Sequence, residues 1–108
     1  MEEKDFNEFC DRAVRVCGEE AQIRMCIEEM SELTKELCKY IRVQKDNKPL
    51  DKENLNKTKQ NIIEETADVI NCVKQISRMF GEEEVEKVRE QKIERATKYL
   101  DRDEKMGE

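Results

Sequence analysis

Two long segments of this chain repeat apolar residues every three or four positions, which is the period of an amphipathic helix. They cover residues 26–41 and residues 62–76. Because each such helix must cover its apolar stripe with another apolar surface, the pattern favours a fold made of packed helices. The stripes consist of Cys26, Met30, Leu33 and Leu37 in the first segment and of Ile62, Val69, Val73 and Ile76 in the second.

Both segments also carry two acids three residues apart. Glu29 and Glu32 form the first pair, and Glu65 and Asp68 form the second. Residues three apart lie about 60° apart around a helix, so each pair shares one face. The two pairs stand at the same angle to their stripes and are related by a shift of 36 residues (29 to 65, and 32 to 68). If the stripes pack against each other, the four carboxylates converge.

Four converging carboxylates repel one another unless protons or cations neutralise them. An all-oxygen site is typical of hard divalent cations, which favours Mg²⁺, Mn²⁺ or Ca²⁺ over zinc or copper. The alternative is that these acids lie on solvated helix faces, since 27 of the 108 residues are acidic and such spacings recur by chance.

The composition predicts a single all-α domain over residues 1–108. Charged residues make up 44% of the chain and hydrophobic residues 36%, so one copy has a limited core and we expect a homo-oligomer. The net charge of −6 argues against nucleic-acid binding. No apolar run has the length of a membrane span, and the start of the chain lacks the order of a signal peptide, so we expect a cytoplasmic protein.

The five cysteines and the absence of histidine limit the chemistry. An odd cysteine count without a C-x-x-C motif predicts reduced thiols, four of them on or beside the apolar stripes: Cys10, Cys17, Cys26 and Cys72. Without histidine, a cysteine–histidine nucleophile is excluded. The Glu-x-x-His pairs of ferritin-like di-iron bundles are absent for the same reason.

Capping and helix-breaking residues mark the ends of four expected helices. Asp5 is the predicted cap of the first helix, and Asp51 or Asn56 that of the third. Gly18 and Gly81 break the chain between helices. A polar connection follows the second helix, and the tail from residue 103 is expected to fray. The predicted helices run from about residue 5 to 17, from 19 or 21 to 43, from 51 or 56 to 80, and from 82 to 101.

Other polar residues accompany the acid pairs. Gln22 lies two turns before Glu29 on the same side, where it can contact a base or sugar. Asn71 follows Asp68 by three residues and can hold a metal-bound water. Lys92 and Arg95 share a helix face and can contact phosphate oxygens. A solvated helix face is the alternative for each of these residues.

Four stretches, taken together, resemble the MazG-like nucleotide pyrophosphohydrolases, above all the short members from phages and bacteria. They are residues 18–22, ending in Gln22, residues 27–33 and 64–69 with the acid pairs, and Lys92-Ile-Glu-Arg95. The resemblance extends from about Phe6 to about Leu100. It implies a four-helix bundle, completed by homo-oligomerisation into a dimer or tetramer.

The same resemblance implies an enzyme that hydrolyses a nucleoside triphosphate to a monophosphate and pyrophosphate with Mg²⁺. It assigns the metal-binding and catalytic roles to the acids Glu29, Glu32, Glu65 and Asp68. Lys92 and Arg95 fall where relatives carry a basic pair for the phosphates. Asn71 departs from the pattern, because many close relatives have an acid there, so the identity of a general base stays open. The non-enzymatic alternative is a helical binding or regulatory module.

Overall fold

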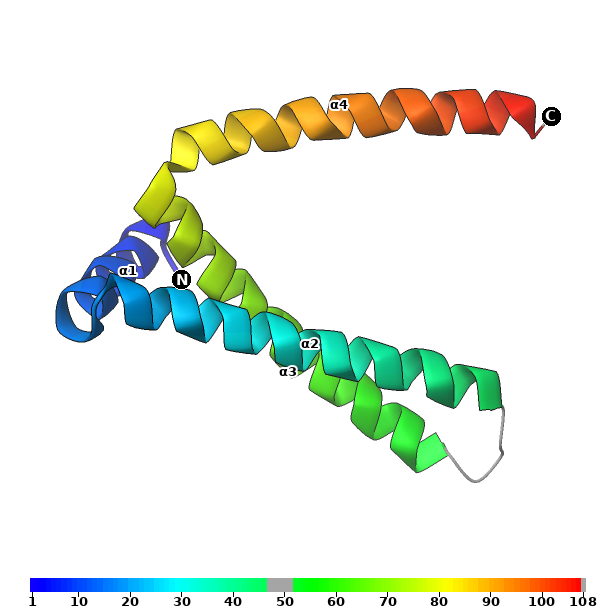
Figure 1. Cartoon of the computed structure of the whole chain (residues 1–108), viewed down its shortest axis with the longest axis horizontal. Coiled ribbons are helices and arrows are strands. Elements are labelled where there is room, and N and C mark those ends of the chain that lie inside the picture. The colour runs from blue at the N-terminus through cyan, green and yellow to red at the C-terminus, as the bar shows by residue number, and fades with distance from the viewer. Residues whose placement is uncertain (47–51, 108) are drawn as a thin grey trace. The chain divides into compact units, whose positions relative to one another are not determined.

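The computed structural model describes residues 1–46 and 52–107, and of residues 45 and 46 only the backbone. These residues form helices and no strand, which confirms the all-α prediction. Figure 1 shows the four helices, which are α1 (Glu3–Cys17), α2 (Glu19–Asp46), α3 (Lys52–Phe80) and α4 (Glu82–Met106).

The first helix does not begin where the sequence predicted. Glu2 occupies the N-cap position of α1 and makes no side-chain capping bond, so the prediction that Asp5 caps the helix is wrong. Asp5 instead lies in the first turn with Glu3. An acid there still interacts favourably with the helix dipole, which explains why the capping pattern was misleading.

Other helix ends extend beyond the predicted ones. The second helix continues three residues past Val43, to Asp46. Asn56 lies inside α3 and does not cap it, whereas Asp51, the other candidate, is outside the described residues. The fraying expected from Asp103 is also wrong, because α4 stays helical to Met106.

Two glycines allow the chain to change direction between helices. Gly18, between α1 and α2, has a φ of 92°, and Gly81, between α3 and α4, has a φ of 134°. Side chains disfavour both conformations. The backbone N–H of Gly18 donates to the carbonyl of Val14 at 2.9 Å, so it closes the last turn of α1 as predicted.

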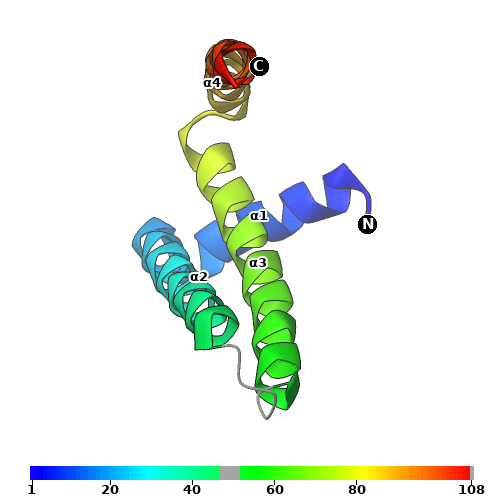
Figure 2. The same ribbon diagram turned by 90° about the vertical axis from the view of Figure 1, so that its right-hand side faces the viewer.

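The chain divides into two compact units, residues 1–76 and 77–108. In the first unit, α2 and α3 run in opposite directions, and α1 lies across the end away from their connection (Figures 1 and 2). Asn61 Nδ2 on α3 donates to Glu36 Oε2 on α2 at 3.5 Å. Gln75 Nε2 on α3 donates to the backbone carbonyl of Cys10 on α1 at 3.4 Å. These bonds join the three helices of this unit.

The first unit has a small core that contains several polar groups. Its buried apolar residues are Cys10, Cys26 and Cys72, and burial raises the pKa of the Cys26 and Cys72 thiols, so both are neutral at pH 7. This confirms the prediction of core thiols at these positions. The same prediction is wrong for Cys17, which is exposed. Cys38 is exposed as well. The buried polar residues are Gln22, Glu36, Thr58 and Gln75.

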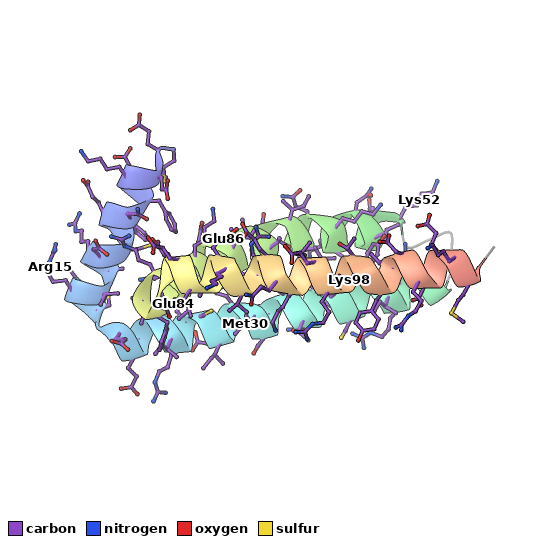
Figure 3. All side chains as sticks on the ribbon, turned by 90° about the horizontal axis from the view of Figure 1, so that it is seen from above. Arg15, Met30, Lys52, Glu84, Glu86 and Lys98 are labelled. Carbon is purple, nitrogen blue, oxygen red and sulfur yellow. The ribbon has the colours of Figure 1, made fainter. Side chains whose placement is uncertain are left out.

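The second unit consists of residues 77–108, of which α4 forms the main part. Every residue of α4 is exposed, and Figure 3 shows side chains such as Glu86 and Lys98 projecting from it. The ion pair between Arg89 Nη2 and Glu86 Oε1, at 2.6 Å, joins adjacent turns of this helix. Such exposed pairs stabilise a helix only slightly.

No helix in the described ranges 1–46 and 52–107 has both the length and the apolar composition that crossing a bilayer requires.

Candidate metal centre

Three of the predicted acids come together between α2 and α3. Glu29 projects from α2, and Glu65 and Asp68 project from successive turns of α3. One carboxylate oxygen from each residue lies within 4.8 Å of the other two. The helical period explains why Glu65 and Asp68 share one face of α3, and this face is turned towards Glu29 on α2.

One oxygen of this cluster lacks a partner. Glu65 Oε2 is buried and is the only such side-chain atom, among the described residues, without a hydrogen bond. Leaving a buried acceptor unpaired costs about 1–3 kcal/mol, and more when the group is charged. A cation or a proton at this position removes the cost.

The ionisation of Glu29 reflects the same crowding. Burial raises the pKa of Glu29, and hydrogen bonding to Glu65 and repulsion by the charges of Asp68 and Glu65 raise it further. The protonated carboxyl of Glu29 can donate a hydrogen bond to Glu65, which contributes to the raised pKa of Glu29. The cluster therefore holds a proton more tightly than separate carboxylates do.

The fourth predicted ligand, Glu32, lies elsewhere. Its side chain is exposed, one turn beyond Glu29 on α2, and it is not part of the group of three. Its role as a ligand stays a prediction. The neighbouring acids Glu28 and Glu64 are also exposed.

A cavity of about 510 Å³ adjoins the cluster, with Glu29 and Asp68 in its wall. Two residues that the sequence singled out for substrate binding, Gln22 and Asn71, line the same cavity. Gln22 is only 5% exposed, so it does not lie on a solvated helix face. Cavities of this size accommodate small organic ligands.

The sequence interpretation overlooked other residues of this cavity. Gln75 lies in the wall, as does the apolar side chain of Phe9. A signal for Gln75 was present, since it follows Asp68 by seven residues just as Gln22 precedes Glu29 by seven. In two antiparallel helices this spacing brings both amides to the same end of the seam.

Lys92 and Arg95 are exposed residues of α4 and belong to the second unit. Their predicted contact with phosphates stays a prediction.

The donors of the cluster fit a hard divalent cation. All are carboxylate oxygens, the ligands that Mg²⁺, Mn²⁺ and Ca²⁺ prefer. The chain has no histidine, and no cysteine belongs to this group of three. Comparison of the chain with protein-family models, curated proteins and solved structures yields no significant match in any of the three.

Proposed function

We propose that this protein is a Mg²⁺-dependent nucleoside triphosphate pyrophosphohydrolase. The observation that carries the proposal is the unpaired, buried Oε2 of Glu65 within a group of three carboxylates that adjoins a cavity. The order of motifs that resembles the MazG-like pyrophosphohydrolases supports it. Hydrolysis adds water oxygen to the α-phosphorus, breaks its bond to the α,β-bridging oxygen and releases a monophosphate and pyrophosphate.

In this proposal the residues divide the work between metal binding and substrate binding. Glu29, Glu65 and Asp68 hold the cation, with Glu32 as a fourth ligand supplied from the next turn of α2. Mg²⁺, or Mn²⁺ in its place, supplies Lewis-acid activation of water and neutralises charge on the triphosphate. Asn71, in the cavity wall beside Asp68, orients the attacking water through its carboxamide.

The nucleoside portion lies in the cavity, where Gln22 offers hydrogen bonds. Lys92 and Arg95 contact the leaving pyrophosphate in this proposal, which rests on the sequence resemblance. A protein of net charge −6 needs such cations near an anionic substrate.

We also propose that the working form is a homo-oligomer, formed as a dimer or a tetramer. Large apolar side chains stay exposed along α2 and α3: Met30 (labelled in Figure 3) is 42% exposed, Leu37 43% and Ile70 48%. A second copy offers the same stripes, so a twofold axis covers both at once. In the described part of the chain, the only buried apolar residues are three cysteines. Because this core is so small, we expect the apolar stripes to be covered by another chain.

The experiment compares the wild type with Glu65→Gln and Glu64→Gln under Mg²⁺, measuring monophosphate and pyrophosphate release from nucleoside triphosphates. We expect Glu65→Gln to abolish turnover and to weaken Mn²⁺ binding at least 100-fold, since it removes a ligand, not just its hydrogen-bonding support. Glu64→Gln, the matched exposed neighbour, retains both properties. Circular dichroism checks that each variant stays helical.

Full turnover in Glu65→Gln contradicts the metal assignment. Nucleotide binding by the wild type without any pyrophosphate release identifies a helical binding module instead of an enzyme. Glu32→Gln decides whether the exposed fourth acid contributes, because Mn²⁺ affinity falls only if Glu32 reaches the cation.

A further inference from the structure

Two buried carboxamides, those of Gln22 and Gln75, line the cavity beside the cluster. Gln22 is 5% exposed and Gln75 is 6% exposed, and both line the cavity that also contains Glu29 and Asp68. Polar side chains this deeply buried normally have hydrogen-bond partners, and here the cavity is where a ligand can provide them.

The spacing of these residues matches the size of a nucleoside. Gln22 precedes Glu29 by seven residues, and Gln75 follows Asp68 by seven. Seven residues of helix rise by about 10 Å, and the antiparallel helices place both amides at the same end. A sugar and a base span the interval between a phosphate held at the carboxylates and the two amides.

A hydrogen bond to α1 orients the side-chain amide of Gln75. Its Nε2 donates to the backbone carbonyl of Cys10 at 3.4 Å. Turning the amide over would place Oε1 against that carbonyl, so two acceptors would face each other without a proton between them. Gln75 therefore presents Oε1 as an acceptor on the other side of its amide. No hydrogen bond within the described residues anchors the amide of Gln22, which can offer either its oxygen or its nitrogen.

We propose that Gln75 is a specificity-determining residue whose Oε1 accepts a hydrogen bond from an N–H donor of the nucleobase. The proposal rests on the proposed function, which places the triphosphate at the carboxylates. Gln22 turns to match whichever group lies beside that donor, and Phe9 and Met25 provide apolar contact with the base. The site should therefore bind a nucleotide whose base has a free N–H on its edge. It should bind polyphosphates without a base, and bases methylated at that nitrogen, more weakly.

The test measures equilibrium binding by calorimetry in Mg²⁺ with three ligands. These are a non-hydrolysable uridine triphosphate analogue, its N3-methyl derivative and inorganic tripolyphosphate. Uracil suits the test because, once attached to the sugar, it has a single N–H donor. The proteins are the wild type, Gln75→Leu and the matched control Gln60→Leu, which removes an exposed glutamine from the same helix.

We expect N3-methylation to weaken binding to the wild type about tenfold or more, because it leaves a buried acceptor unpaired. Gln75→Leu should show the same loss for the unmethylated analogue and no further loss for the methylated one. Its affinity for tripolyphosphate stays at the wild-type value, and Gln60→Leu matches the wild type with every ligand. Gln75→Met, an unbranched side chain of similar length, repeats the comparison if the leucine variant melts early.

Equal affinity of the wild type for the two uridine analogues overturns the role of Gln75. So does a loss of tripolyphosphate binding in Gln75→Leu as large as the loss of nucleotide binding. A wild type that binds neither nucleotide nor tripolyphosphate with Mg²⁺ overturns the proposed function itself, and this proposal with it. The tripolyphosphate arm therefore separates failure of the base site from failure of the metal site.

Discussion

The carboxyl group of Glu29 makes the candidate metal centre sensitive to pH. Burial, together with the neighbouring acids Glu65 and Asp68, raises the pKa of Glu29 above its ordinary value of 4.5. The folded protein therefore binds this proton more tightly than the unfolded chain does. The resulting contribution to stability is complete below pH 4.5 and is lost as the pH rises through the pKa of the folded state.

We therefore expect the metal-free wild type to lose stability, relative to Glu29→Gln, as the pH rises from about 4.5 towards neutrality. The glutamine has no proton to lose, so its free energy of unfolding lacks this contribution. Urea denaturation of both proteins at a series of pH values, with a chelator present, measures the difference. Adding Mg²⁺ at neutral pH should restore stability to the wild type, because the cation replaces the proton among the carboxylates.

Glu28→Gln is the control for this pH experiment, since Glu28 is the exposed neighbour on the same helix. Its free energy of unfolding should follow that of the wild type at every pH. A Glu29→Gln variant that also follows the wild type throughout would show that Glu29 titrates as an isolated carboxyl, and that the cluster does not hold its proton.

The three clustered acids were predictable from the sequence because a helix fixes the angle between residues three apart. Glu29, Glu65 and Asp68 needed only that angle and two neighbouring helices that turn these faces towards each other. Gln75 needed more, since its buried position and the direction of its amide depend on the carbonyl of Cys10 in α1. That contact joins positions 65 residues apart, and no local pattern reports it.

Among the structural elements, the junction of α1 and α2 depends on Gly18. Its φ of 92° and ψ of 156° lie in a region that is almost confined to glycine. A Cβ at this position would meet no atom within 4 Å, so the cost of a side chain comes from the backbone alone. We expect Gly18→Ala to lower the free energy of unfolding by about 1–3 kcal/mol, as measured by urea denaturation.

Gly107→Ala provides the control, because Gly107 has a φ of −78° and already adopts the helical conformation. Alanine is favoured there, so this variant should keep or slightly raise the stability. If both alanine variants have the same stability, the junction does not need its glycine conformation.

Helix interiors were predicted better than helix ends. The apolar period continues through many residues, so one discordant position does not hide it. A helix end depends on a few local bonds, and an acid such as Asp5 is favourable at the cap and in the first turn alike. Helix α4 continues beyond Asp101 because most of the following residues are good helix formers: Arg102, Glu104, Lys105 and Met106. The prediction of a frayed tail did not take these helix propensities into account.

For the whole molecule, the main consequence concerns the apolar stripes. The sequence predicted that one copy would leave them partly uncovered, and the structure leaves Ile41 54% exposed and Ile63 62% exposed. Neither the identity of the partner nor the number of copies follows from a stripe, since any complementary apolar face covers it. Oligomerisation therefore needs a direct measurement.

Leu37→Asp provides that measurement. Leu37 is 43% exposed in one copy, so a charge there costs little in a monomer. In a homo-oligomer packed through α2 and α3 the same charge becomes buried and unpaired, and the assembly dissociates. Light scattering should give a multiple of the 12.9 kDa chain mass for the wild type and a lower mass for Leu37→Asp. Lys35→Asp changes an exposed residue of the same helix and serves as the control, so it should have the mass of the wild type. A wild type that stays at 12.9 kDa at high concentration would instead mean that the stripes are not covered by copies of this chain.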